Sequence, residues 1–142
     1  MNRKYTPEMI TGPSMLPPNS IFVFGSNTQG RHGAGSAKTA MEKFGAINLQ
    51  AHGFQGASYG IITTNLETRK PYPLVWIANQ IDGLILEAKY CLKMGAKTVF
   101  YVTKFGTERA GYSVEEIALL WRNRVVPDNI ILPVEFDNRP EV

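Results

Sequence analysis

The chain is predicted to be an α/β protein in which helices cover both faces of a mostly parallel sheet. Short, fully apolar segments alternate along the chain with longer segments whose apolar residues recur at helical spacing. A fully apolar strand is typical of a parallel sheet that is covered on both faces. The order strand, helix, strand, helix, strand, helix, strand therefore predicts a three-layer α/β/α architecture with a mixed, mostly parallel sheet.

The first half of the chain begins without a clear pattern. Residues 1–19 contain four prolines and no periodicity, so we expect an irregular lead-in. Ile21–Phe24 form a short apolar strand, and Ala34–Phe44 form a helix that ends at a glycine. The segment 46–59 is expected to be a loop. The next apolar strand covers Tyr59–Thr63.

The second half alternates more regularly. Apolar residues at helical spacing predict a long helix over Leu74–Met94. A break at Asp82-Gly83 would divide this region into two helices. Further apolar strands are expected at Thr98–Val102 and Ile130–Leu132. The two tryptophans, Trp76 and Trp121, lie in helical patterns and are expected in the core.

The start of the last helix is the best-defined boundary in the chain. Ser113 and Glu116 have the spacing of a capping box, in which each side chain binds the backbone N–H of the other residue. Tyr112 and Ile117 stand where a hydrophobic staple packs. We therefore expect a helix that begins directly after Ser113.

Length, composition and charge limit the classes of function. The 142 residues, 44% of them apolar and 19% charged, predict a single globular domain over 1–142. No apolar run approaches the roughly 18 residues of a membrane span, and the N-terminus lacks the apolar core of a signal peptide. A single cysteine allows no intramolecular disulfide, which fits a cytoplasmic location. A net charge of +3 does not indicate nucleic acid but is compatible with a small anionic ligand.

Two glycine-rich loops each follow a predicted strand and lead into a helix. The first runs from Gly25 to Gly35 and the second over Thr103–Gly111. Because ligands of open α/β sheets sit beyond the carboxyl ends of the strands, the two loops are expected to enclose one elongated anion. Their backbone N–H groups would bind phosphate oxygens without a charged side chain. The alternative is that the glycines serve only tight turns.

Two common phosphate-binding motifs are excluded by spacing. Gly30 and Gly35 have the separation of a P-loop, but Ser36-Ala37 precede Lys38, so the lysine comes two positions late on the helix. The dinucleotide fingerprint G-x-G-x-x-G would need a glycine where Lys38 stands. The loops thus belong to neither motif.

Gly25-Ser26-Asn27, followed by Arg31-His32-Gly33-Ala34-Gly35-Ser36-Ala37, resembles the first loop of the macro domain, approximately N-A-A-N and then G-G-G-V-x-G-A-I. The second macro loop reads approximately S-x-G-x-x-G-[Y/F]-P-x-E-x-A, and Thr103–Ala118 is similar to it through Gly106, Gly111, Tyr112, Glu115 and Ala118. The likeness covers about residues 20–135 and is closest to a divergent bacterial or phage macro-like group. It implies a macro-like fold that binds ADP-ribose or a related nucleotide diphosphate, either free or on an ADP-ribosylated macromolecule.

The chain departs from the macro pattern at three places. Typical members carry G-D-[I/V]-T before the first strand, whose Asp holds the adenine amino group, whereas the only acid in that region here is Glu8. Some hydrolytic members carry an Asp where Ala34 stands. No pair of glutamates follows Gly35, as in the group that cleaves poly-ADP-ribose. Binding with or without hydrolysis therefore remains open at this point.

Candidate site residues come from both loops. His32, which titrates near neutrality, and Glu108, the only carboxylate within either loop, are the candidates for proton transfer if the protein is a hydrolase. A structural histidine and an exposed glutamate are the alternatives. The predicted ligand-binding residues are Gly25, Ser26, Asn27, Arg31, Gly33, Ala34, Gly35, Ser36, Thr103, Gly106, Thr107, Arg109, Ala110, Gly111 and Tyr112.

The sequence gives no indication of a metal or a cofactor, and we expect neither. The expected partner is a nucleotide-type small molecule such as ADP-ribose, with no membrane and no nucleic acid. There are two alternative hypotheses for the function. The protein is a phosphate-binding hydrolase or transferase acting on another nucleotide, or it is a non-catalytic interaction module.

Overall fold

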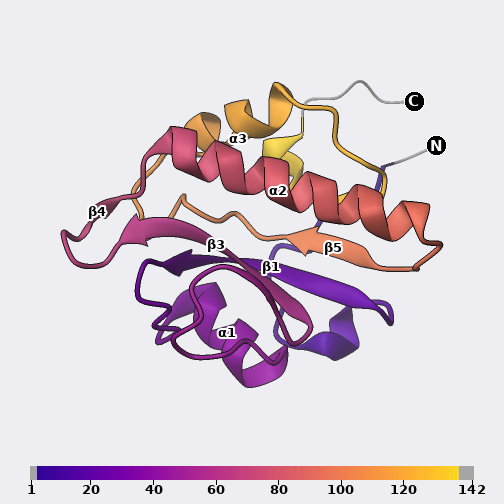
Figure 1. Ribbon diagram of the computed structural model, residues 1–142, viewed down its shortest axis with the longest axis horizontal. Coiled ribbons are helices and arrows are strands. Elements are labelled where there is room, and N and C mark those ends of the chain that lie inside the picture. Colours follow the sequence, from indigo (N-terminus) through magenta and orange to yellow (C-terminus); the bar gives the residue numbers. More distant parts are fainter. Residues whose placement is uncertain (1–2, 138–142) are drawn as a thin grey trace.

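The computed structural model describes residues 3–137. The helices are α1 (Gly35–Lys43), α2 (Leu74–Lys93) and α3 (Val114–Arg122), with short 3-10 turns η1 (Pro13–Met15) and η2 (Val134–Phe136). The strands are β1 (Ser20–Asn27), β2 (Gly53–Gln55), β3 (Ser58–Asn65), β4 (Lys70–Pro71), β5 (Val99–Val102) and β6 (Ile130–Ile131). The sheet has α2 and α3 on one face and α1 on the other (Figure 1). The predicted three-layer α/β/α fold is thus confirmed.

The sheet is parallel at its centre and antiparallel at one edge. Its strand order is β2-β3-β1-β5-β6, with β4 paired to the end of β3. β1 runs parallel to both β3 and β5, and β5 runs parallel to β6. β2 and β4 run antiparallel to β3. The carboxyl ends of β1 and β5 therefore lie side by side, and both glycine loops leave the sheet at the same end.

Alternate residues of β1 form the two cores. Val23 is fully buried among the side chains of α2 and α3. Phe22 and Phe24 point to the other face, where Phe22 stacks on Phe44 at the end of α1 with ring centroids 4.5 Å apart. Because both faces of β1 are buried, the strand carries no polar residue between Ile21 and Phe24.

The structure corrects several sequence-based boundaries. β1 continues to Asn27, so the first part of the predicted loop lies in the sheet, and the predicted loop 46–59 contains β2. α2 is continuous through Asp82-Gly83. Within the predicted irregular lead-in, η1 forms, and Ile10 and Leu16 are buried in the core on the α1 side.

The two tryptophans have different environments. Trp121 is 1% exposed, as expected, and packs between α2 and the C-terminal segment. Trp76 is 51% exposed, so its predicted place in the core is wrong. Trp76 lies in the first turn of α2, on the side that faces away from the sheet, with its ring 5.1 Å from that of Tyr72.

The capping box at the start of α3 is confirmed. The Ser113 hydroxyl accepts a hydrogen bond from the Glu116 backbone N–H, and the Glu116 carboxylate accepts one from the Ser113 backbone N–H. Two N–H groups that the helix leaves unpaired are thereby satisfied. This fixes where the second glycine loop ends and α3 begins.

Candidate functional site

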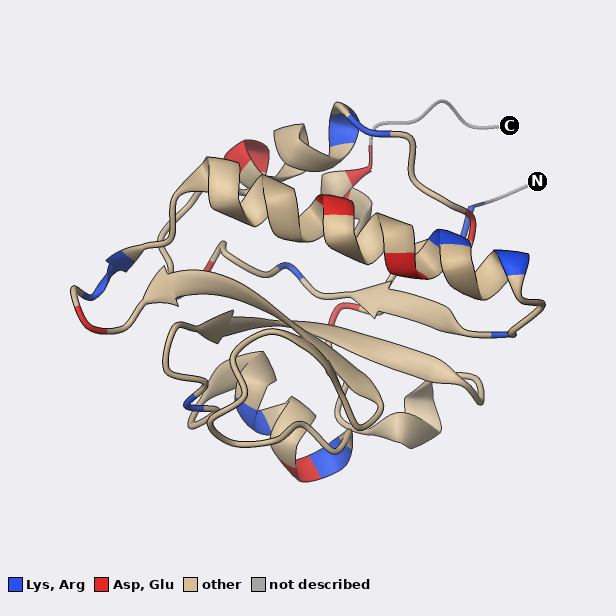
Figure 2. Cartoon of the chain, viewed as in Figure 1, with Lys and Arg blue, Asp and Glu red and all other residues tan. Residues whose placement is uncertain are grey.

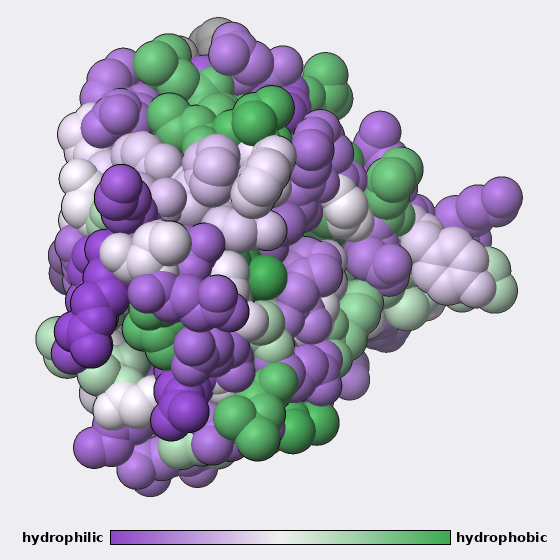
Figure 3. All heavy atoms as spheres, turned by 60° about the vertical axis from the view of Figure 1, so that its left-hand side comes forward, coloured by the Kyte–Doolittle hydropathy of each residue, from purple (hydrophilic) through white to green (hydrophobic). Residues whose placement is uncertain are grey.

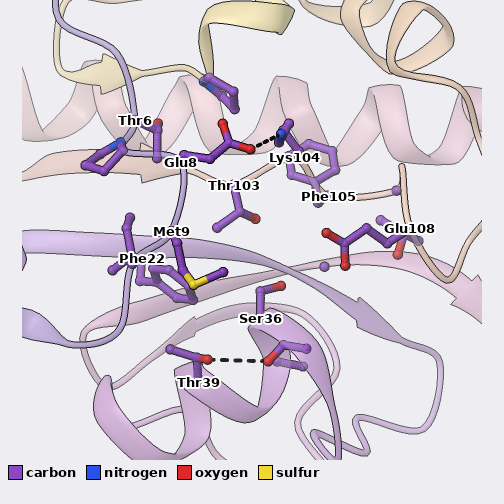
Figure 4. A pocket seen from close by; sticks show the side chains of 18 of the residues that line it. Thr6, Glu8, Met9, Phe22, Ser36, Thr39, Thr103, Lys104, Phe105 and Glu108 are labelled. Atoms are coloured by element: carbon purple, nitrogen blue, oxygen red, sulfur yellow. Dashed lines mark hydrogen bonds and ion pairs between the residues drawn. The ribbon is translucent and has the colours of Figure 1, made fainter.

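A pocket of about 620 Å³ lies beyond the carboxyl ends of β1 and β5. Its walls come from the lead-in segment 6–11, the start of α1, the second glycine loop and the segment 133–135. Ser36 and Thr103 approach it from opposite sides (Figure 4). The volume lies within the range of roughly 300–1,000 Å³ typical of small-molecule sites. The surface at this end of the sheet is mostly hydrophilic, with separate hydrophobic groups (Figure 3).

The first wall is the N-terminus of α1. Ala34 precedes the helix in an extended conformation, and no side chain caps this end. The Lys38 N–H bonds the Ala34 carbonyl at 3.2 Å. The N–H groups of Gly35, Ser36 and Ala37 have no carbonyl partner among the described residues, as is usual in the first turn of a helix. These three donors and the positive end of the helix dipole favour an anion here.

The second wall is the loop after β5, which is held by its own hydrogen bonds. The Thr103 hydroxyl donates to the Val23 carbonyl at 2.8 Å, and the Tyr112 N–H donates to the Gly106 carbonyl at 3.0 Å. Gly106 has φ +81°, and a Cβ there would lie 2.9 Å from Ile117 Cδ1. The backbone N–H groups of Gly106, Glu108, Arg109 and Ala110 have no partner in the described part of the chain.

An ion cluster of Glu8, Lys104 and Glu135 lines one part of the pocket. Figure 4 shows Glu8 beside Lys104. Lys104 Nζ lies 2.7 Å from Glu8 Oε1 and 3.2 Å from Glu135 Oε2. The hydrogen bond that Lys104 donates to Glu8 is the main cause of the raised pKa of Lys104. The pKa of Glu135 is lowered, first by a hydrogen bond from its own backbone and then by Lys104. The cluster joins the lead-in, the second glycine loop and η2.

Part of the predicted site comes together in this pocket. The predicted residues that line it are Gly25, Ala34, Gly35, Ser36, Thr103, Gly106, Glu108, Arg109 and Ala110. The predicted residues that do not line it are Ser26, Asn27, Arg31, His32, Gly33, Thr107, Gly111 and Tyr112. The glycine loops thus contribute mainly backbone, while most of their polar side chains are used elsewhere.

Asn27 closes the turn that follows β1. Its side-chain Nδ2 donates to the Arg31 carbonyl at 2.9 Å, and its Oδ1 accepts from the N–H groups of Gln29 and Arg31 at 3.2 and 3.1 Å. This is the common use of an asparagine in a turn. The Tyr112 side chain also has a structural partner, because its hydroxyl donates to the Tyr72 carbonyl at 2.6 Å.

His32 is 1% exposed and lies under the first glycine loop. Its Nε2 is 3.0 Å from both the Gln50 carbonyl and Gln55 Oε1, and its ring meets Phe24 edge-on. Gln55 Oε1 also accepts from the Ile47 N–H, so both neighbours are acceptors and Nε2 carries the proton. His32 therefore connects the first glycine loop to the loop 46–56 through these hydrogen bonds.

Glu108 is the candidate for proton transfer that the structure places at the pocket. Its side chain has no ion pair or hydrogen bond within the described chain, and it is exposed. The carboxylate points toward the side of the pocket where Ser36 and Thr103 lie (Figure 4).

Sequence reasoning missed the residues that come from outside the glycine loops. Thr6–Thr11 lie far along the chain from the first loop, and Glu135 lies near the other end, yet all reach the pocket. No periodicity marks these segments, and Glu8 is distinguished only as the one acid in the region where the macro pattern carries an Asp. Lys104 was also missed, although it lies within the second loop, two residues after the end of β5.

Charges of both signs are spread over helices and loops (Figure 2). No helix between residues 3 and 137 has both the length and the apolar character needed to cross a membrane. The same residues contain no group of three or more His, Cys, Asp or Glu side chains arranged to hold a metal ion. No family model, curated protein or solved structure in our comparisons matches the chain.

Proposed function

We propose that this protein binds ADP-ribose or a related nucleotide diphosphate in the pocket between its two glycine loops. One observation carries the proposal: residues of both loops that line the same pocket have unpartnered backbone N–H groups in the described chain. Ser36 and Ala37 supply them from α1, and Glu108 and Ala110 supply them from the second loop. Converging N–H groups at a helix N-terminus are a common way to hold phosphate oxygens.

The charges along the pocket orient the ligand. At the end formed by Glu8, Lys104 and Glu135, two carboxylates surround one ammonium group, so no positive charge is left for a phosphate. We therefore assign the diphosphate to the start of α1. The uncharged part of the ligand then extends toward the side of the pocket where Met9 and Phe22 lie (Figure 4).

Calorimetric titration of the whole protein tests this proposal. ADP-ribose is expected to bind, and AMP, NAD and a nucleic-acid oligomer rank the alternatives. Tighter binding of another nucleotide would favour the alternative hypothesis that the protein is an enzyme acting on that nucleotide. No binding of any of the four would overturn the proposal.

Ser36→Glu is the sharpest variant for the diphosphate position. A carboxylate in the first turn of α1 interacts favourably with the helix dipole, so α1 is expected to become more stable by about 0.3–1 kcal/mol. The same charge repels a phosphate, so ADP-ribose binding should be lost. Ser36→Gln serves as the control, because a glutamine side chain is nearly as large as a glutamate side chain but carries no charge. Equal affinities of the two variants would place the diphosphate elsewhere.

Hydrolysis of an ADP-ribose linkage is a second candidate function, favoured by the unpaired carboxylate of Glu108 at the pocket. In this reaction Glu108 takes a proton from a water molecule, whose oxygen attacks the anomeric carbon of the ribose. The bond to the modified side chain breaks, and the released side-chain atom regains a proton. Glu108→Gln should abolish loss of the modification from an ADP-ribosylated protein while ADP-ribose still binds. If the native protein releases no ADP-ribose, binding is its only function at this site.

A further inference from the structure

The outward face of α2 carries large apolar side chains that the fold leaves exposed. Val75, Trp76, Leu86, Tyr90 and Met94 at the helix end are 62%, 51%, 66%, 60% and 63% exposed. At 3.6 residues per turn they lie opposite the side of α2 that packs on the sheet. α2 extends across the whole width of the molecule, with α3 beside its N-terminal half (Figure 1).

Gly83 lies at the midpoint of α2, which covers Leu74–Lys93, and is half-buried among these exposed side chains. A glycine within a helix costs roughly 0.5–1 kcal/mol relative to alanine. The fold of one molecule does not require this glycine: a Cβ there would meet only the Tyr59 hydroxyl, at 3.9 Å. The missing side chain instead leaves room for another backbone to approach α2 from outside.

We propose that two copies of this chain form a dimer in which their α2 helices cross antiparallel at Gly83. In a two-fold symmetric contact the same surface is used on both molecules. Residues equally far from the crossing point then meet. Trp76 lies seven residues before Gly83 and Tyr90 seven residues after it. Trp76 of each molecule therefore packs beside Tyr90 of the partner subunit, with Gly83 against its own copy.

Charge favours a second copy over a strongly charged partner. The charged residues of α2 are two acids, Asp82 and Glu87, and two lysines, Lys89 and Lys93, so their charges sum to zero. They begin at the middle of the helix and continue toward its C-terminal end (Figure 2). Two such faces meet without net repulsion, whereas a nucleic acid or an anionic membrane would need a positive surface.

The exposed apolar surface of α2 supplies more than half of the area that a dimer needs. Each of the five apolar side chains is more than half exposed, so together they offer about 500 Å² of surface. A stable interface buries roughly 800 Å² on each partner. Exposed polar residues of α2, such as Asn79 and Glu87, extend this surface. No residue of α2 lines the pocket, so the dimer leaves both pockets open and does not depend on the proposed ligand.

Sedimentation of the full chain over a concentration series tests the dimer, with tryptophan fluorescence as a second readout. Because Trp121 is already buried, a blue shift of the emission with rising concentration reports on Trp76. Leu86→Ser should weaken association about tenfold or more. Leu49→Ser removes an equally exposed leucine on the loop 46–56 and should leave association unchanged. A monomer at every concentration up to about 1 mM overturns the proposal.

Gly83→Ala separates the interface from folding stability. The alanine should raise the unfolding temperature of the monomer, since it favours the helix, and should weaken association at least about tenfold because it separates the two backbones. An increase in stability without weaker association would contradict the crossing at Gly83.

A disulfide trap tests the symmetry directly. In a Cys91→Ala background, Gly83→Cys places one thiol on each side of the two-fold axis, within reach of the other. Mild oxidation should give a covalent dimer that still binds ADP-ribose if the proposed function is correct. Lys38→Cys on α1 is the control and should not cross-link. Failure of the Gly83→Cys variant to cross-link would overturn the antiparallel arrangement.

Discussion

At the scale of single residues, His32 holds the first glycine loop in place before any ligand arrives. Its Nε2 donates to two acceptors, and its backbone N–H donates to Asn48 Oδ1 at 3.2 Å. α1 begins three residues later at Gly35. A loop fixed in this way has little conformational freedom to lose when an anion binds to its backbone.

His32→Leu is expected to lower the free energy of unfolding by about 1 kcal/mol, because the hydrogen bonds from Nε2 to the Gln50 carbonyl and to Gln55 Oε1 are lost while each acceptor keeps a second donor. Urea denaturation measures the change. His52→Leu is the control, since His52 is exposed. If His32→Leu keeps full stability but abolishes hydrolysis of an ADP-ribosylated substrate, the structural role of His32 is wrong. His32 would then be a candidate for proton transfer again.

Gly106 determines the shape of the second glycine loop. Its φ of +81° favours glycine, and an added Cβ would press on buried Ile117. Gly106→Ala is therefore expected to destabilise the protein by at least about 1 kcal/mol and to weaken ADP-ribose binding. Urea denaturation and calorimetric titration measure the two effects. Gly33→Ala, where nothing lies within 4 Å, should change neither. Equal effects of the two substitutions would contradict this explanation.

At the scale of elements, α1 and α3 begin in different ways. α3 is capped by Ser113 and Glu116, whereas α1 has no side-chain cap and its first residues line the pocket. The cap makes the start of α3 a fixed structural point. The uncapped start of α1 leaves its donors available to a ligand.

Ser113→Ala should therefore lower the free energy of unfolding by about 1 kcal/mol, because the Glu116 N–H loses its acceptor. Thermal or urea denaturation measures the change. Ser14→Ala removes a hydroxyl from an exposed residue of η1 and is expected to be neutral. A neutral Ser113→Ala variant would mean that the capping box does not stabilise α3.

At the scale of the whole molecule, ion pairs connect distant segments. Lys104 links the lead-in to η2, and Arg124 joins the segment after α3 to Asp82 in the middle of α2 at 2.6 Å. The hydrogen bond from Arg124 is the main cause of the lowered pKa of Asp82. These contacts make stability depend on pH at both ends of the range.

Acid is expected to destabilise the fold. The pKa values of Asp82 and Glu135 are lowered from 3.8 and 4.5, so their contribution is present above these values and is lost as the pH falls through the lower, folded-state values. The pKa of Lys104 is raised from 10.5, so its contribution is full below that pH and is lost as the pH rises through the folded-state value. Urea denaturation across a pH series measures both. Asp82→Asn should flatten the acid side, and an unchanged acid profile would contradict the role of Asp82.

Local pattern was sufficient to predict most of the architecture. The apolar run ending at Phe24 and the helical spacing along α2 each depend on residues close in sequence, as does the capping box at Ser113. Boundaries failed where tertiary pairing extended an element: β1 continues to Asn27 because β3 pairs with it that far. β2 forms within a predicted loop because β3 provides a partner strand.

The sequence by itself determined the α/β/α order and the two glycine loops that meet at one end of the sheet. Only the tertiary structure decided which loop residues face the pocket, that Glu8 and Glu135 meet at Lys104, that His32 is buried and that Trp76 is exposed. The physical reason is that the interactions involved act over different separations along the chain. Periodicity, capping and turn preferences arise between neighbours along the chain, whereas burial and the walls of a pocket arise from segments that only folding brings together.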